Sequence, residues 1–279
     1  MKRLLTILPI VLLLACEDVI PIELPGDPDL LVIEGWLMDT NQRQLVTITR
    51  TNGFSSSEPV PKVDDAEVKV ISNSGLEFPF TNSGDGQYFS NVPFGGEYGV
   101  SYQLIVVLAE GDTIISAPEV LTEVSDIDSL SFNFFVTQDE ENPRLDITVY
   151  YPIAFSADPA EETNFYKWNV FRNNMMFDSP EQIILLEDRF INGNDFRNDF
   201  TAFEFSEFDT ARVEIQSLSS SVFNFFTLFR SQVVSLGTSS GSQPASLVGN
   251  LENISNPNQQ ILGFFGASSV KSREIVILP

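Results

Sequence analysis

Apolar and polar residues alternate along several short segments of this chain, and a period of two predicts β-strands. The alternation is clearest at residues 44–50 and 67–71. Further strands are expected in the first half at residues 30–37, 88–90, 100–108 and 112–116. Turn residues separate these segments, among them Asn73-Ser74-Gly75 and Glu110-Gly111. Short strands at regular spacing, without a helical stretch, predict an immunoglobulin-like β-sandwich over residues 30–123, with a small barrel as the alternative.

The second half, residues 124–279, carries another set of expected strands, which begins at Phe132. These strands are expected at residues 144–151, 164–172, 182–186, 200–208, 211–218 and 274–278. In residues 221–236 the period of the hydrophobic pattern changes, since apolar side chains recur there at helical spacing. The apolar face holds Val222, Phe225, Phe226, Phe229, Val233 and Leu236. Serines 219–221 are candidate N-caps and Gly237 a candidate stop. We expect a second antiparallel β domain with one amphipathic helix packed across its sheet.

The N-terminus has the pattern of a secretory signal peptide. Lys2 and Arg3 precede an apolar run over residues 4–15. Such a run forms a helix of roughly 18 Å, too short for a bilayer core of about 30 Å. Residues 1–15 are therefore interpreted as a signal peptide rather than a membrane span.

Cys16, the only cysteine, follows Leu13-Leu14-Ala15 in a pattern similar to a bacterial lipobox. This resemblance implies cleavage before Cys16 and lipidation of that residue, which anchors the chain in a membrane. Glu17 and Asp18 come next and resemble a surface-export signal. Residues 16–29, rich in proline, are expected to be a lipidated tether. The expected location is the outer membrane, with the chain facing the cell exterior.

Composition restricts the function further. The chain has 39 acidic and 15 basic residues, a formal net charge of −24, and no histidine. So negative a chain is not suited to bind nucleic acid. Without histidine, and with its one cysteine lipidated, the chain lacks Ser-His-Asp and Cys-His catalysis and His-ligated zinc sites. It also has no Gly-rich phosphate loop, and no cofactor is expected.

Clustered oxygen-bearing side chains give one weak calcium candidate, because Ca²⁺ needs six to eight oxygen ligands. It comprises Asn192, Asn194, Asp195 and Asp199, around Gly193. A polar turn is the favoured interpretation, since the order of a calcium loop is missing. Asp139-Glu140-Glu141-Asn142 is interpreted as a solvated hairpin tip.

Aromatic side chains are the other candidate binding residues, since they line binding grooves as well as cores. The candidates are Trp36, Trp168, Tyr150, Tyr151, Tyr166, Phe203 and Phe205. In strands that alternate with polar residues, a place in the core is favoured over a groove.

Several segments together resemble one family in order and spacing. They include Leu31-Val32-Ile33-Glu34-Gly35-Trp36, Asp85-Gly86-Gln87-Tyr88, Gly99-Val100-Ser101-Tyr102-Gln103-Leu104, Ile127-Asp128-Ser129-Leu130 and Ile261-Leu262-Gly263-Phe264-Phe265. In this order they resemble the Bacteroidota lipoproteins of domain-of-unknown-function family 4249. The resemblance implies an outer-membrane lipoprotein, often encoded beside a TonB-dependent receptor. It carries over no catalytic residue.

The leading hypothesis is a surface-exposed, non-enzymatic lipoprotein that acts as an accessory or ligand-binding subunit. Its expected partner is a TonB-dependent receptor or another outer-membrane barrel. Two alternatives stay open. One is a hydrolase of glycans that uses two carboxylates, which needs only an acid and a nucleophile or base. The other is a structural or adhesive surface protein.

Overall fold

The computed structural model describes residues 29–52, 56, 58–139, 141–142, 144–160, 163–236, 247 and 249–278. The predicted signal peptide, Cys16, the Glu17-Asp18 pair and Gly237 lie outside these residues. Of the predicted tether, only Asp29 is described. Among the helices of the described residues, none has the length and apolar character needed to cross a bilayer.

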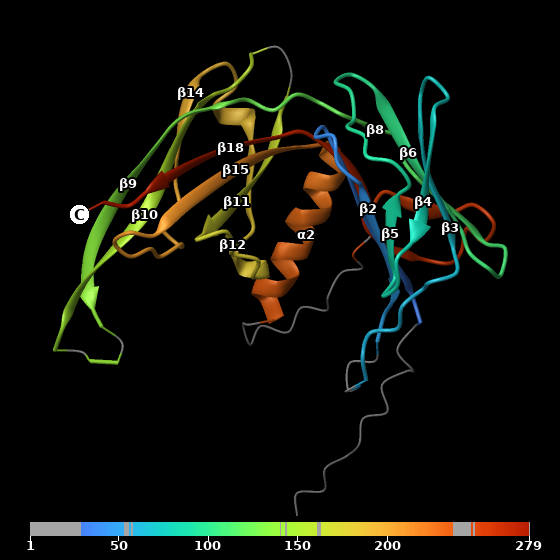
Figure 1. Ribbon diagram of the computed structural model, residues 1–279, viewed down its shortest axis with the longest axis horizontal. Helices are drawn as coiled ribbons and strands as arrows, with labels where there is room; N and C mark the ends of the chain where they lie inside the picture. Colours follow the sequence, from blue (N-terminus) through green and yellow to red (C-terminus); the bar gives the residue numbers. More distant parts are fainter. Residues whose placement is uncertain are drawn as a thin grey trace, which may run out of the picture.

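The fold is mainly β, as predicted, and its first part is one continuous sheet of ten strands (Figure 1). These strands are β1 (Leu31–Met38), β2 (Leu45–Arg50), β3 (Glu67–Ser72), β4 (Glu77–Asn82), β5 (Gln87–Ser90), β6 (Ser101–Val107), β7 (Thr113–Ser116), β8 (Glu119–Val120), β16 (Leu251–Asn253) and β17 (Ile261–Ser268). Their order is β16-β7-β6-β3-β4-β5-β2-β1-β17, and β8 pairs with β6.

Alternation explains the core of this sheet. In β2, Val46 and Ile48 are buried, and in β3 Val68 and Val70 are buried. Because successive strand residues point to opposite faces, these side chains share one face. They pack with β1, β6 and β17 into one mainly aliphatic cluster. The alternating segments thus form the inner face of a curled sheet.

The two ends of this sheet meet, which makes it a near-barrel. β16 pairs with β7 at one end, while β17 pairs in parallel with β1 at the other. Asn250 connects them, because its side-chain amide accepts from the Phe265 N–H at 3.0 Å and donates to the Phe265 carbonyl at 2.7 Å. The Asn250 amide thereby takes the place of one pair of backbone–backbone hydrogen bonds, such as those that join neighbouring β-strands. This single curled sheet is nearer to the barrel alternative, and the immunoglobulin-like detail is not confirmed.

The near-barrel also changes the division of the chain. The sequence placed all of residues 124–279 in the second unit, whereas β16 and β17 belong to the first sheet. Two glycines permit the close approach of β17. Gly263 has φ +94°, and a Cβ there would lie 2.0 Å from the Ile33 carbonyl oxygen. A Cβ on Gly266 would lie 2.6 Å from the Trp36 ring.

The second unit, which we call the open half, contains two smaller sheets. One has the order β14-β10-β9, from β9 (Ile127–Gln138), β10 (Asp146–Ala157) and β14 (Asp195–Asp199). The other has the order β12-β11-β15-β18, with β13 beside β11, from β11 (Phe165–Arg172), β12 (Met175–Met176), β13 (Ile184–Glu187), β15 (Thr210–Leu218) and β18 (Val270–Val276). Two 3₁₀ turns, η1 (Pro180–Gln182) and η2 (Asp188–Phe190), lie between these strands.

Several predicted boundaries in this half were wrong. The segment expected to be a strand at residues 200–208 is a series of turns, with only an isolated bridge from Phe205 to Tyr150. Its aromatic residues enter the core from a loop, since the Phe203 N–H donates to the Phe200 carbonyl. β9 begins at Ile127 rather than at Phe132, and the last strand ends at Val276.

The predicted helix is confirmed as α2 (Ser220–Leu236). The Ser219 hydroxyl caps it by accepting from the Val222 N–H at 3.3 Å. The helix packs against the sheet of the near-barrel and also against the sheet of the open half that contains β11. Packing against a sheet of the second domain alone was expected. Phe226 stacks on Trp36 of β1 at 6.1 Å between ring centroids, whereas Phe223 lies 4.9 Å from Phe165 of β11.

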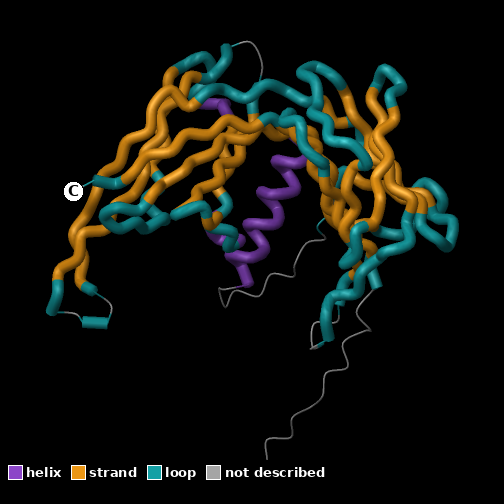
Figure 2. The backbone as a smooth tube through the Cα atoms, in the orientation of Figure 1, coloured by secondary structure: helices purple, strands orange, loops and turns teal. Residues whose placement is uncertain are grey.

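The molecule has the shape of an arch (Figure 2). The near-barrel forms one limb and the open half the other, and α2 lies in the hollow beneath (Figures 1 and 2). Residues 121–126, between β8 and β9, and Ser269, between β17 and β18, connect the limbs. The chain also passes from β15 of the open half through α2 to β16 of the near-barrel. The top of the arch is therefore the place where functional side chains from both limbs can meet.

Candidate functional site

Two neighbouring cavities lie at the junction of the limbs. The larger junction cavity has a volume of about 540 Å³ and is lined by residues 120–126 together with Gly99, Pro159 and Asn164. The smaller junction cavity, of about 460 Å³, lies between β8, the start of β11 and the start of α2. Both share Val120, Thr122 and Asn164 as lining residues.

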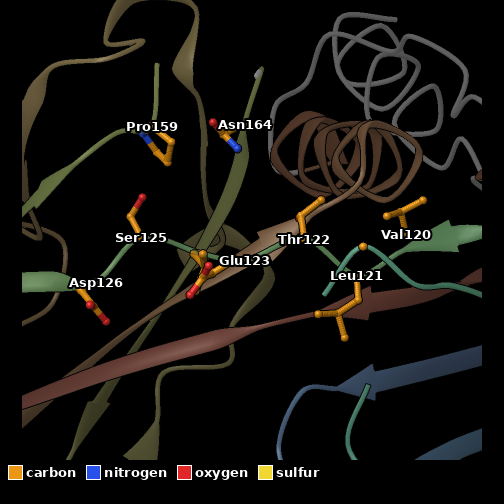
Figure 3. A pocket seen from close by; sticks show the side chains of 10 residues that line it. Val120, Leu121, Thr122, Glu123, Ser125, Asp126, Pro159 and Asn164 are labelled. Atoms are coloured by element: carbon orange, nitrogen blue, oxygen red, sulfur yellow. The ribbon is translucent and has the colours of Figure 1, made fainter. Parts of the chain in front are cut away.

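The connecting segment is extended where it lines the larger cavity. In Figure 3, Val120 and Thr122 point toward the side on which Asn164 lies, while Leu121 points the other way. Leu121 is fully buried in the core of the near-barrel, which fixes this alternation. The cavity thus has one wall from each limb.

A group of residues that we call the serine junction holds the two limbs together. It comprises Ser217, Ser268, Ser269 and the carbonyl of Thr122. The Thr122 carbonyl accepts from the hydroxyls of Ser217 at 3.0 Å and Ser269 at 2.8 Å. The Ser268 hydroxyl donates to the Ser217 carbonyl at 2.7 Å. All three serines are almost completely buried, so these bonds form away from competing water.

Glu119 is the buried acid of the site, with only 2% of its surface exposed. Its Oε1 accepts from the Ser221 hydroxyl and from the Asn250 side-chain amide, both at 2.6 Å. It therefore connects β8 to the start of α2 and to the closure of the near-barrel. Its Oε2 is buried and has no hydrogen-bond partner among the described residues.

Asn164 also lines the smaller cavity. Its backbone N–H donates to Asp188 Oδ2 at 2.7 Å, which fixes its position. Its side-chain Oδ1 is buried and has no hydrogen-bond partner in the described part of the chain.

Tyr166 and Asp158 form a rigid pair beside Asn164. The Tyr166 hydroxyl donates to Asp158 Oδ1 at 2.7 Å, and Asp158 Oδ2 accepts from the Gly193 N–H at 3.1 Å. Burial and the bond to Asp158 raise the pKa of Tyr166 well above its usual range, so the hydroxyl stays protonated. Both oxygens of Asp158 are thus engaged in holding the wall of the cavity.

The larger cavity carries negative charge from Glu123 and Asp126. Burial, the bond to Asp39 and the charges of Asp39, Glu123 and Asp126 raise the pKa of nearby Tyr98 to about 12. Lys271 lies 3.7 Å from Asp126, but Asp126 is 79% exposed, so this pair is weak. None of the residues that line either junction cavity is Lys or Arg.

The calcium candidate is not assembled by the fold. Asp195 and Asp199 lie at opposite ends of β14, about 13 Å apart along an extended strand. Both oxygens of Asp199 accept from Arg197, at 2.6 and 2.9 Å. Asn192 and Asn194 bond to each other in the preceding turn. In the described ranges no group of three or more acidic or cysteine residues is placed to hold a metal ion.

The Asp139 cluster lies at the tip of the β9–β10 hairpin. Asp139 Oδ1 accepts from the N–H groups of Glu141 and Asn142, both at 2.8 Å, which shapes a turn. This agrees with the interpretation as a hairpin tip, although Glu140 lies outside the described residues.

Most aromatic candidates form the core of the open half. Trp168, Tyr150, Tyr166, Phe203 and Phe205 are all at least 93% buried and belong to one cluster. Trp36 contacts α2, while Tyr151 lies 6.3 Å from Phe135 on the β9–β10 hairpin. Of these side chains only Tyr166 lines a junction cavity.

Sequence reasoning did not identify Glu119 or Asn164. Each is one ordinary polar residue near a strand end, and their bonding partners lie far away in sequence. The signal that was present is local: an acid in the segment Ala117-Pro118-Glu119-Val120-Leu121, which is otherwise apolar. A carboxylate in such surroundings is usually paired when it is buried.

The chain matches a known protein family over most of its length. Residues 17–274 match the family described as Domain of unknown function (DUF4249). No curated protein matches the chain.

Proposed function

We propose that this chain, which belongs to the DUF4249 family, is a non-enzymatic, ligand-binding lipoprotein of the bacterial outer membrane. The observation that carries the proposal is the pair of junction cavities. They are preformed, because the serine junction and Glu119 hold both walls in place. A hollow with a few fixed polar groups between rigid elements is typical of a binding site.

The membrane part of the proposal depends on Leu13-Leu14-Ala15-Cys16 and the acidic pair that follows. Lipid on Cys16 attaches the chain to the outer membrane, and residues 17–29 separate the lipid from β1. With Glu17 and Asp18 as an export signal, the arch faces the cell exterior. There it presents its ligand to a barrel partner, for which a TonB-dependent receptor is the first candidate.

The absence of enzymatic activity is part of the proposal. A glycan hydrolase needs two free carboxylates about 5 to 10 Å apart. The buried acids beside the smaller cavity, Glu119, Asp158 and Asp188, are engaged in structural bonds, and Asp188 accepts from the Asn164 N–H. Glu119 bonds to Ser221 and Asn250, and Asp158 bonds to Tyr166 and Gly193. These commitments favour binding over hydrolysis.

Labelling and localisation test the anchor. Cells that express the full chain are fed a labelled fatty acid, and intact cells are then treated with protease. We expect label on the wild type and none on Cys16→Ser, with cleavage of the wild type from outside. A labelled protein that resists protease on intact cells contradicts the surface location.

A pull-down tests the partner. The lipidated chain, solubilised in mild detergent, is expected to recover an outer-membrane barrel protein, while Cys16→Ser recovers much less. Recovery of no barrel protein contradicts the accessory role. Turnover on a panel of glycans, lost on single Asp or Glu substitution, contradicts the non-enzymatic assignment.

A further inference from the structure

β9 is a long edge strand whose outer part lies open. It has 12 residues and pairs with β10 alone among the described strands. Its residues 133–138 are exposed throughout, with Phe134 57% and Val136 59% exposed. The outer end of the β9–β10 hairpin extends beyond the other strands of the open half (Figures 1 and 2). Apolar side chains and one backbone edge of β9 are therefore accessible together.

The other open edges of this half differ from β9 in composition or length. β14 has three charged residues in five and β18 three in seven, while β12 and β13 have only two and four residues. Charge, proline and short length are the usual means by which proteins keep an edge strand from pairing with another chain. Residues 129–138 contain no charged residue and no proline, although the chain carries a net charge of −24. Of these edges, β9 alone is left without such protection.

The backbone of outer β9 directs its hydrogen-bonding groups away from β10 at alternate residues. Tyr150 of β10 exchanges backbone hydrogen bonds of 2.9 and 3.0 Å with Phe205, on the side away from β9. Its partner on β9, Phe134, therefore points its own N–H and C=O to the free edge. In agreement, the Phe134 N–H donates to Asn133 Oδ1 at 2.9 Å. By the same alternation Val136 directs its N–H and C=O to this edge.

The inner end of the same edge is already covered. The guanidinium of Arg273, on β18, donates to the Asp128 carbonyl at the start of β9. From Phe132 to Gln138 no strand of the described part of the chain pairs with this edge. The free edge is thus the outer part of β9, and we call it the β9 edge.

We propose that the β9 edge receives an extended segment of a partner protein, which adds to the sheet as an antiparallel strand. Apolar residues at alternate positions of the segment contact Phe134 and Val136, which share one face of β9. Backbone hydrogen bonds to the same two residues supply the rest of the contact. The inference gives the accessory role in the proposed function a binding surface, and it rests on that role.

The acidic tip of the hairpin determines the charge of the segment. Residues 139–146 hold four acidic residues and one basic residue. A strand that continues the antiparallel order of β14, β10 and β9 brings its N-terminal end to this tip. Basic residues at that end are attracted by the acids, so we expect a segment with lysine or arginine before its apolar run.

Two other occupants fit this surface less well. A second copy of the chain would bring its own net charge of −24, and repulsion between like charges opposes association. A lipid surface would have to take in the acidic tip before the apolar side chains behind it, and burial of unpaired charge is costly. A basic partner segment meets neither obstacle.

Val136→Pro is the sharpest variant. It removes an N–H that faces the β9 edge and leaves the hydrogen bonds to β10, which Phe135 and Thr137 make. Proline is tolerated on an edge strand where the N–H faces away from the sheet. Val136→Ala is the matched control, because it shortens the same exposed side chain and keeps the N–H.

The probe is a fluorescently labelled peptide, Lys-Lys-Thr-Val-Thr-Val-Thr-amide, titrated into the full chain in mild detergent and followed by anisotropy. We expect binding that Val136→Pro weakens about tenfold or more and that Val136→Ala changes little. On the wild-type chain, the same peptide with methylated backbone nitrogens should not bind, since its donors are lost. With glutamates in place of its lysines it should bind about tenfold more weakly. Hydrogen exchange in residues 132–138 should slow when the unmodified peptide binds.

Several results overturn the proposal. One is no change of anisotropy with a wild-type chain whose circular dichroism shows it folded, and another is equal affinity for wild type and Val136→Pro. A dimer in analytical ultracentrifugation that Val136→Pro dissociates would assign the β9 edge to a second copy. Binding of the unlipidated Cys16→Ser chain to phosphatidylethanolamine vesicles, lost in Phe134→Asp, would assign it to a lipid surface.

The two proposals fail separately. If the pull-down recovers a barrel protein but the peptide does not bind, the accessory role stands and the β9 edge is not its surface. If the peptide binds but no barrel protein is recovered, the accessory role to a barrel falls while the β9 edge remains a strand-binding surface.

Discussion

The two limbs of the arch differ in whether the edge strands of their sheets are left open. The near-barrel closes its sheet through β16, β17 and Asn250, and its core is mainly aliphatic. The open half leaves its sheets open and fills its core with aromatic side chains from loops and strands. Closure removes exposed backbone edges, whereas an open sheet leaves them available. We infer that the near-barrel is the stable support and the open half the adaptable limb.

Loss of a large core residue from the closing strand should have the greatest effect. Phe265 on β17 is fully buried, so Phe265→Ala is expected to lower the free energy of unfolding by about 3–5 kcal/mol. Phe134→Ala in the open half is the control, since Phe134 is 57% exposed and its loss should change stability by about 0.5 kcal/mol or less. Urea denaturation measures both. Equal effects would mean that β17 is not essential to the near-barrel.

The second largest loss of stability is expected for Asn250, whose side-chain amide joins the two ends of the sheet. Asn250→Ala leaves the N–H and carbonyl of Phe265 without their side-chain partner and removes one bond to Glu119. We expect a loss of about 2–3 kcal/mol in urea denaturation. Asn250→Asp should be at least as damaging, because it places a carboxylate beside Glu119. A neutral outcome for both variants would show that the ends do not depend on this amide.

Lys167 in the open half should give a smaller effect of opposite sign. It lies on β11 beneath α2, 5.7 Å from the Phe226 ring, and burial lowers its pKa to about 8 from 10.5. Lys167→Met removes the cost of this buried charge. At pH 7 we expect a gain of about 1–2 kcal/mol in the free energy of unfolding, by urea denaturation.

The pH dependence distinguishes this cause from improved packing. Since the folded pKa of Lys167 lies below the unfolded value, the unfolded chain binds the proton more tightly. Stability of the wild type should therefore rise between pH 8 and 10.5, and the gain from Lys167→Met should shrink over that window. Tyr98 and Tyr166 oppose the rise above pH 10, because their raised pKa values favour the folded state only while they stay protonated. A constant gain from pH 7 to 10 would contradict a charge-based origin.

Phe208 should give the smallest change. It is 69% exposed in the open half and has φ +70°, a conformation that a bulky residue rarely adopts. Phe208→Gly relieves this strain, and we expect a gain of about 0.5–1 kcal/mol by thermal unfolding. Phe208→Ala keeps the strain and serves as the control. A larger gain for alanine than for glycine would mean that backbone strain is not the cause.

How much the sequence predicts depends on how local the signal is. β2 and β3 were predicted from alternation, and α2 from its helical period, because each pattern lies within one element. β17 shows no alternation, since its side chains are buried on both faces and two glycines interrupt it. β14, with four polar residues in five, was interpreted as part of a turn.

The candidate site was less predictable than the fold. Glu119 receives bonds from residues 102 and 131 positions away in sequence. The amino-acid sequence contains no local pattern that indicates that Glu119, Ser221 and Asn250 meet. Of 39 acidic residues, only the folded structure distinguishes the two described ones, Asp39 and Glu119, that each have a carboxylate oxygen buried without a partner.

The parallel pairing of β1 with β17 has a consequence for how the protein is made. Leu31 pairs with Ile261, so the first strand to be synthesised needs a neighbour made about 230 residues later. Until then β1 exposes one backbone edge to whatever strand it meets. The near-barrel can close only after nearly the whole chain has emerged, so its folding must follow synthesis rather than accompany it. During that interval the chain depends on remaining unfolded and soluble, and its high density of like charge favours both.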